Sequence, residues 1–156
     1  MNTDLNYQIF SDSSEVTESL AEELAKSLRG GEVIEMIGDL GAGKTTFVRG
    51  LTRGLGCVVN VTSPTFSLMN TYSSGRLSVN HFDLYRLEDI GAVRHEIEEA
   101  TSHPENVTII EWAKQIDYIK DLIKIRIDLD ADEQNRKIHF LVPKKFEYLK
   151  KSLENK

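Results

Sequence analysis

The sequence is poor in the residues that cross-link, disorder or anchor a chain. Cys57 is the single cysteine among 156 residues, which excludes an internal disulfide and a zinc site built on several cysteines. Three prolines and 40% hydrophobic residues exclude a low-complexity chain. No apolar run reaches membrane-spanning length, and the N-terminal MNTDLNYQIF lacks the basic and apolar regions of a secretory signal. We therefore expect a cytoplasmic protein without membrane association.

The chain also lacks an excess of positive charge. It carries 19 Lys and Arg against 25 Asp and Glu, a net charge of -6. An acidic chain is a poor general ligand for polyanions, so we expect no DNA binding, and contact with RNA only through a partner or a local patch. The lysine-rich tail has Phe146, Leu149 and Leu153 at helical spacing, which favours a docked terminal helix with a solvated lysine face over an RNA-binding patch. The length fits one domain, residues 1–156.

The first third of the chain alternates between helical and strand-like patterns. Asp12 and Glu15 form a capping-box pattern before apolar residues that recur every four positions up to Leu28. Residues 32–37 are short and mostly apolar, as in a buried strand, and residues 45–55 again have helical spacing. The order is therefore helix, strand, glycine-rich loop, helix.

The rest of the chain is richer in strands. Residues 58–72 and 76–85 predict a hairpin around the turn SSG, residues 87–100 have weak helical spacing, and residues 107–112 predict a short buried strand. Alternating polarity then predicts strands over 122–130 and 137–142, joined by DADEQN as a second hairpin. We predict an α/β fold with a mixed sheet, a parallel half extended by antiparallel strands.

The loop after the strand at 32–37 carries the pattern G-x-x-x-x-G-K-[ST] in Gly38, Gly43, Lys44 and Thr45. Glycines let backbone N–H groups turn onto phosphate oxygens, and the following helix directs its positive end at the same anion. Lys44 places a charge on the phosphates, and the Thr45 hydroxyl suits Mg²⁺, which prefers oxygen ligands. The motif predicts a P-loop NTPase-like sandwich that binds a nucleotide triphosphate through Gly38, Asp39, Leu40, Gly41, Ala42, Gly43, Lys44, Thr45 and Thr46.

A P-loop requires a further acid near the metal, at the end of a neighbouring strand. Glu111 ends the apolar run VTIIE, and Asp83 ends the half-polar run VNHFD. Either carboxylate can hold Mg²⁺ through water while the other orients the attacking water. We favour Glu111 for the metal because its strand is more apolar, and we predict Lys44, Asp83 and Glu111 as the catalytic residues.

The residues around these acids have structural interpretations, and some of them have a functional alternative. His81 on a strand is ordinarily a structural residue. Arg86 fits either a stabiliser of transferring phosphate or an ion pair with Asp83, and Trp112 fits either the core or a surface that stacks a base or meets a partner. The segment SPTF at 63–66 fits either a loop that senses the terminal phosphate or a proline turn.

Four motifs, GDLGAGKTTF, SPTFSL, HFDLYRL and IEW, occur in this order within residues 30–115. In this the chain resembles the TsaE (YjeE) family, the ATPase of bacterial tRNA threonylcarbamoyladenosine synthesis. The resemblance implies a P-loop fold, ATP or ADP with Mg²⁺, weak ATPase activity, and assembly with TsaB and TsaD. It also implies that TsaD transfers the threonylcarbamoyl group to adenosine 37 and that TsaE turnover resets the complex between cycles. We expect contact with tRNA only indirectly, through that complex.

The resemblance also implies roles for individual residues. Thr45 and Glu111 match the magnesium positions, Asp83 matches the other essential acid and is a further metal candidate, and Lys44 matches the phosphate lysine. It further assigns Ser14 and Arg136 to the nucleotide, and a partner or switch surface to Thr65, His81, Tyr85, Arg86 and Trp112. The chain departs from the family at residues 87–107, which lack a Leu-Gly stretch, and at Ala113, where proline is usual.

Three rival functions share the P-loop. A small P-loop kinase encloses its substrates with an arginine-rich lid, and here the arginines are scattered. A GTPase has DxxG and NKxD motifs, which are missing; NHFD, beginning at Asn80, lacks the lysine. A nucleotide-gated scaffold without significant hydrolysis differs from the favoured function only in whether turnover matters.

Overall fold

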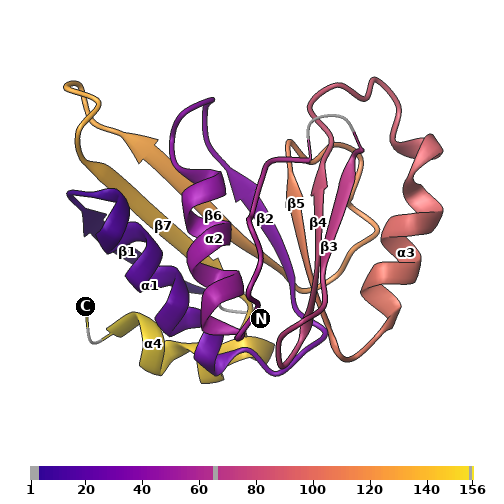
Figure 1. Cartoon of the computed structure of the whole chain (residues 1–156), viewed down its shortest axis with the longest axis horizontal. Helices are drawn as coiled ribbons and strands as arrows, with labels where there is room; N and C mark the ends of the chain where they lie inside the picture. The colour runs from indigo at the N-terminus through magenta and orange to yellow at the C-terminus, as the bar shows by residue number, and fades with distance from the viewer. Residues whose placement is uncertain (1–3, 65–66, 155) are drawn as a thin grey trace.

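The computed structural model describes residues 4–64, 67–154 and 156. A single mixed sheet runs through the molecule, with helices packed against it (Figure 1). Its strand order is β1-β7-β6-β2-β5-β4-β3. The strands are β1 (Leu5–Ser11), β2 (Val33–Ile37), β3 (Met69–Tyr72), β4 (Ser78–Asp83), β5 (Asn106–Glu111), β6 (Leu122–Leu129) and β7 (Arg136–Val142).

The centre of the sheet is parallel and its edges are antiparallel. β2 pairs in parallel with β5 and β6, and β4 pairs in parallel with β5. β1, β7 and β3 add antiparallel strands outside this centre. The predicted α/β fold with a mixed sheet is confirmed. Because β2, β4 and β5 point the same way, the loops and acids that follow them meet at one edge.

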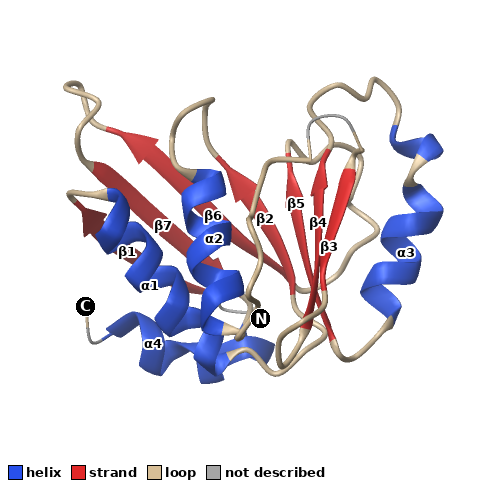
Figure 2. Cartoon of the chain, viewed as in Figure 1, coloured by secondary structure: helices blue, strands red, loops and turns tan. Residues whose placement is uncertain are grey.

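The helices cover the two faces of the sheet unequally (Figure 2). α1 (Ser14–Ser27), α2 (Lys44–Gly54) and α4 (Lys150–Glu154) contribute side chains to one apolar core, whereas α3 (Arg94–Ser102) contributes to a second core. Alternate residues of β5 separate the two cores: Ile109 belongs to the first and Ile110 to the second. No helix in the described part of the chain combines the length and apolar character needed to cross a bilayer.

α2 is held against α1 by a close backbone approach. A Cβ atom on Gly50 would lie 2.2 Å from the Glu18 carbonyl oxygen, so only glycine allows this helix spacing. Arg53 bridges the pair from outside, with its Nη1 2.8 Å from a Glu18 carboxylate oxygen. The packing fixes α2, and with it the P-loop that leads into its first turn.

Two features of the N-terminal region differ from the prediction. The cap of α1 is Ser13, whose hydroxyl accepts a hydrogen bond from the Val16 amide at 3.2 Å, not Asp12. β1 was not anticipated; it lies at the edge of the sheet, and its exposed residues alternate with residues that are half-exposed or, at Ile9 and Ser11, buried. Its partner β7 is far away in the sequence, with Leu5 opposite Val142.

Some of the predicted bounds after residue 57 also differ from those in the structure. Residues 58–64 form no strand, so the first arm of the predicted hairpin is only β3, and the helix predicted over 87–100 is a short 3-10 turn followed by α3. The hairpin of β6 and β7 is confirmed. The terminal segment docks as predicted, with Phe146, Leu149 and Leu153 buried over a 3-10 turn (Lys144–Leu149) and α4.

Candidate functional site

The P-loop joins the end of β2 to the start of α2. Gly43 precedes the first helical residue with φ 111°, a left-handed conformation that side chains rarely adopt. The Ala42 amide donates to the Asp39 carbonyl at 3.1 Å, which closes the turn. α2 therefore begins at Lys44 with its amide end facing the loop, the arrangement that binds anions in other proteins.

Lys44 is buried within this loop, with 6% of its surface exposed. Its Nζ donates to the carbonyl oxygen of Gly38 and, at 3.3 Å, to that of Asp39. The same ammonium lies 4.4 Å from the centre of the Trp112 ring. Burial lowers the pKa of Lys44, and the negative charges of Glu111 and of other nearby acids oppose this shift.

The two predicted acids end neighbouring parallel strands, and Asp83 on β4 stands directly opposite Glu111 on β5. Asp83 accepts hydrogen bonds from the Ser63 hydroxyl and the Tyr85 amide, both at 3.0 Å. Glu111 is buried, and its Oε1 lies 2.8 Å from His81 Nε2. A residue distant in sequence therefore contacts each carboxylate: Ser63 contacts Asp83, and His81 contacts Glu111.

A cavity of about 500 Å³ lies between the P-loop and these strand ends. The structure brings all three predicted catalytic residues to its wall. Its lining residues are Asp39, Leu40, Gly41, Gly43, Lys44, Thr45, Thr46, Ser63, Asp83, Tyr85, Arg86, Glu111, Trp112 and Arg136. Ser63 was missed as a site residue, and its place in the SPTF motif was the available signal.

An aromatic pair forms one side of this cavity. The rings of Tyr85 and Trp112 have their centroids 4.9 Å apart. Trp112 has φ 54°, an uncommon conformation for a bulky residue, directly after β5. This conformation follows the end of β5, and the Trp112 ring lines the cavity.

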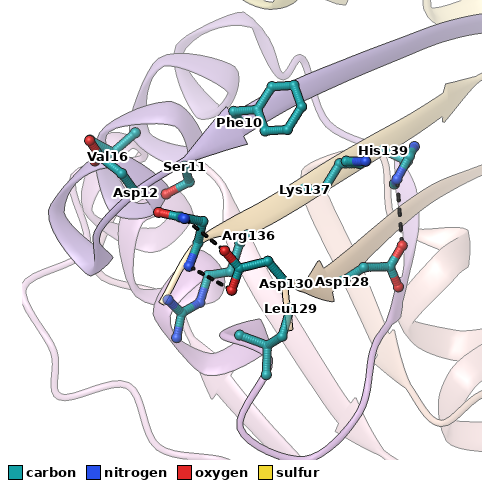
Figure 3. A pocket seen from close by; sticks show the side chains of 11 residues that line it. Phe10, Ser11, Asp12, Val16, Asp128, Leu129, Asp130, Arg136, Lys137 and His139 are labelled. Atoms are coloured by element: carbon teal, nitrogen blue, oxygen red, sulfur yellow. Dashed lines mark hydrogen bonds and ion pairs between the residues drawn. The ribbon is translucent and has the colours of Figure 1, made fainter. Parts of the chain in front are cut away.

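A second cavity, of about 650 Å³, shares one lining residue with the first. Figure 3 shows this second cavity from close by. The side chains of Phe10, Val16 and Leu129 give it an apolar wall, with Asp128 and His139 at one end. Its lining residues are Phe10, Ser11, Asp12, Val16, Asp128, Leu129, Asp130, Asn135, Arg136, Lys137 and His139. Phe10 was missed, because its strand was missed.

Arg136 connects the two cavities, since it lines both. Its Nε donates to the Ala42 carbonyl at 3.0 Å and so joins the hairpin of β6 and β7 to the P-loop. Ser14, the other residue assigned to the nucleotide by resemblance, is the first residue of α1 and is not among the lining residues of either cavity. Its nucleotide contact stays a prediction.

The predicted partner or switch surface is divided by the structure. Tyr85, Arg86 and Trp112 line the first cavity, and Tyr85 is 50% exposed. His81 has no exposed surface, so it cannot form part of an outer face in this conformation, because its strand lies inside the sheet. Thr65 lies outside the described residues.

The donor set at the site suits Mg²⁺. Thr45 offers a hydroxyl and Asp83 and Glu111 offer carboxylates, all hard oxygen donors lining one cavity. In the described part of the chain, no group of three or more His, Cys, Asp or Glu residues forms a metal cage. Mg²⁺ is ordinarily held by one or two carboxylates together with substrate phosphates and water, and the residues present fit that pattern.

Comparisons with known proteins identify the relatives of this chain. A family model, "Threonylcarbamoyl adenosine biosynthesis protein TsaE", matches residues 11–138. Proteins named tRNA threonylcarbamoyladenosine biosynthesis protein TsaE include one from a Nostoc species, 40% identical over 121 residues that cover 76% of this chain and 75% of the relative. One from Aquifex aeolicus is 37% identical over 134 residues, covering 84% of this chain and 92% of the relative.

A solved structure extends the likeness over the whole chain. The crystal structure of YdiB from Bacillus subtilis superposes with a TM-score of 0.81 at 28% identity, covering 99% of this chain and 98% of that one. The fold is that of the P-loop NTPases. The chain belongs to the TsaE family of tRNA threonylcarbamoyladenosine biosynthesis proteins.

Proposed function

We propose that this chain binds ATP and ADP with Mg²⁺ at the P-loop and hydrolyses ATP slowly as a component of the tRNA threonylcarbamoyladenosine machinery. The observation that carries the proposal is the convergence of Lys44, Asp83 and Glu111 on one cavity beside the start of α2. A phosphate-binding loop alone supports binding, whereas two carboxylates facing the same space also support hydrolysis.

Each side chain has a physical role in this proposal. The loop amides and Lys44 hold the phosphate tail, and the Thr45 hydroxyl with one carboxylate holds the metal. The remaining carboxylate orients the attacking water. Mg²⁺, when bound, neutralises charge on the phosphate oxygens. Both acids line the cavity, and we favour Glu111 for the metal because its strand is the more apolar of the two.

Lys44 is placed to respond to the phosphate tail. Its Nζ now donates to the carbonyls of Gly38 and Asp39 within the loop. Phosphate oxygens are stronger acceptors than carbonyls because they carry charge. Binding therefore exchanges neutral partners for charged ones, which favours a polyphosphate over an uncharged ligand.

The second cavity supports a site for the base of the nucleotide. It adjoins the phosphate site through Arg136 and has an apolar wall that includes Phe10 and Val16 (Figure 3). Such a wall suits the flat face of a purine, and Asp128 and Asp130 offer acceptors to its amino groups. We therefore assign the base to the hollow between β1 and the hairpin of β6 and β7.

The rival kinase function has less support. Arg86 and Arg136 are the arginines among the described residues that line the phosphate cavity, and Arg136 is already bonded to the P-loop. An arginine-rich lid is therefore not part of this site. The nucleotide-gated scaffold differs from our proposal only in turnover, and the paired carboxylates favour hydrolysis.

The biological setting follows from the family. The curated relatives are named for tRNA threonylcarbamoyladenosine biosynthesis. We propose that this chain assembles with TsaB and TsaD, that its ATP turnover allows repeated cycles of modification in the cytoplasm, and that it meets tRNA only through that complex. The net charge of -6 supports indirect contact with RNA.

Reconstitution tests the proposal. TsaB, TsaD, threonylcarbamoyl-adenylate and tRNA are combined with this chain and ATP, and modified adenosines are counted per TsaD. We expect several turnovers with the chain and about one without it. Lys44→Ala should remove stimulated ATP turnover and repeated modification together. Equal counts with and without the chain would refute the proposed role.

The exposed Arg49 offers a matched control. It lies on α2 but pairs with Glu18, 3.1 Å away, on the side facing α1. Arg49→Ala removes a positive charge from the same helix without touching the cavity. Its turnover should match that of the unaltered chain, which separates the role of Lys44 from a general loss of charge.

A further inference from the structure

His81 is a fully buried polar residue directly beside the proposed hydrolytic site. It lies on β4 two positions before Asp83, so both side chains leave the strand on the same face. Its exposed fraction is 0%, and its Nε2 lies 2.8 Å from Oε1 of Glu111 on the neighbouring strand. The ring thus reaches across from β4 to the acid that ends β5.

The surroundings of the ring define which nitrogen carries its proton. Within the described part of the chain, His81 Nδ1 is buried and has no hydrogen-bond partner. A proton placed there would be a buried donor without an acceptor. A proton on Nε2 faces a carboxylate oxygen, so the ring donates from Nε2 to Glu111.

This hydrogen bond occupies one of the two oxygens of the Glu111 carboxylate. The hydrogen bond uses Oε1 of Glu111, and Glu111 also lines the phosphate cavity. His81 therefore restrains the rotation of the Glu111 carboxylate. Oε2 of Glu111 is left for a ligand in the cavity. Donors that hold a metal-binding carboxylate in place commonly change metal affinity by 10–100-fold when removed.

We propose that His81 is a positioning residue, which holds the Glu111 carboxylate in the orientation that serves the metal and so sets how strongly Mg²⁺ tightens nucleotide binding. The inference rests on the proposed nucleotide function. It concerns orientation alone, because the ring has no exposed surface and does not line the cavity.

Three substitutions separate positioning from simple space filling. His81→Gln keeps an amide donor near the place of Nε2, His81→Asn places its amide near Nδ1, and His81→Leu has no donor. Calorimetry measures the affinity of the whole chain for ADP and for AMP-PNP, with Mg²⁺ and with EDTA. For each nucleotide, the ratio of the affinity with Mg²⁺ to the affinity with EDTA reports the contribution of the metal.

We expect the Mg²⁺ enhancement to fall about tenfold in His81→Leu and His81→Asn, to stay within about threefold in His81→Gln, and the affinity in EDTA to stay unchanged. Asn80→Ala is the matched control, since Asn80 is the adjacent buried residue and points to the opposite face of β4. It should keep the full enhancement. Should His81→Leu not fold, the contrast between Gln and Asn decides the question.

Two failures are distinguishable. If the unaltered chain binds neither nucleotide, or binds both equally with Mg²⁺ and with EDTA, the proposed function falls and the inference falls with it. If the unaltered chain shows the enhancement and the His81 variants retain it in full, only the positioning role is overturned. An equal loss in the Gln and Asn variants also overturns it, because a purely structural ring would give that result.

Discussion

The Lys44 ammonium lies 4.4 Å from the centre of the Trp112 ring, so the P-loop lysine and the single tryptophan form a cation–π pair. Such pairs contribute about 0.5–2 kcal/mol, depending on how far they are desolvated. A ligand that attracts the ammonium therefore also changes the environment of the indole.

Trp112 should report nucleotide binding directly. Phosphate competes with the ring and with the loop carbonyls for Lys44, so titration with ATP and Mg²⁺ should give a saturable change in tryptophan emission. In Lys44→Ala the change should disappear. An unaltered spectrum at saturating ATP, with binding established by calorimetry, would contradict the pairing as a reporter.

The burial of Lys44 predicts how stability depends on pH. Burial lowers its pKa below the ordinary 10.5, so the folded protein releases this proton more readily than the unfolded chain. The free energy of unfolding should therefore rise relative to Lys44→Met as pH increases through the lowered pKa toward 10.5. Urea unfolding of both proteins, from about pH 8 upward, measures the difference.

Lys26 provides a control, because its pKa shift, and with it the pH dependence of its contribution to stability, has the opposite sign. Its hydrogen bond to Glu23 raises its pKa above 10.5, so its contribution is fully present below that pH and is lost as pH rises through the raised pKa. The pair is exposed, and the effect should be small. A constant difference between Lys44→Met and the unaltered chain at all pH values would refute the assigned shift.

Gly50→Ala should destabilise the fold. Alanine in a helix interior ordinarily stabilises by about 0.5–1 kcal/mol relative to glycine. Here the new Cβ would meet the Glu18 carbonyl at 2.2 Å, and overpacking costs about 1–3 kcal/mol, so the clash outweighs the helix preference. Denaturant unfolding gives the sign. Arg49→Ala, on the exposed surface of the same helix, should cost less than about 1 kcal/mol.

Tyr148→Phe should also cost stability. The Tyr148 hydroxyl donates to Oε1 of Glu32 at 2.5 Å, and that carboxylate is completely buried. Removing the donor takes one hydrogen bond from this buried carboxylate, whose Oε1 keeps the Arg29 amide at 2.7 Å, at a cost of about 1–3 kcal/mol. Tyr118→Phe is the counterpart, because the buried Tyr118 hydroxyl has no hydrogen-bond partner in the described part of the chain. Equal effects of the two changes in thermal unfolding would refute this account.

The main parts of the site could be predicted because they depend on local patterns. The P-loop is continuous in sequence, and strand-like runs that end in Asp83 and Glu111 bring both acids to one edge whenever the strands are parallel neighbours. The sequence does not state that the strands are neighbours. That relation comes from the way α3 carries the chain from β4 back to β5.

Contacts across the sheet were beyond prediction for a physical reason. The bond between His81 and Glu111 depends on the register of two strands, which is set by the packing of both faces. β1 was missed because an edge strand with a solvated face has a weak pattern, and its pairing with β7 is non-local. Residues 58–64 are the opposite case, a predicted strand that did not form. They are rich in β-branched residues, but no neighbouring strand in the described part of the chain pairs with them.

The pairing of the first strand with the last has a consequence during synthesis on the ribosome. Phe10 is among the earliest residues to emerge, yet its cross-strand neighbour Lys137 is made near the end of translation. The cavity that we assign to the base is therefore incomplete until the final hairpin is out, since Arg136, Lys137 and His139 also line it. A chain stalled before β7 should carry the phosphate loop and still be unable to retain a nucleotide.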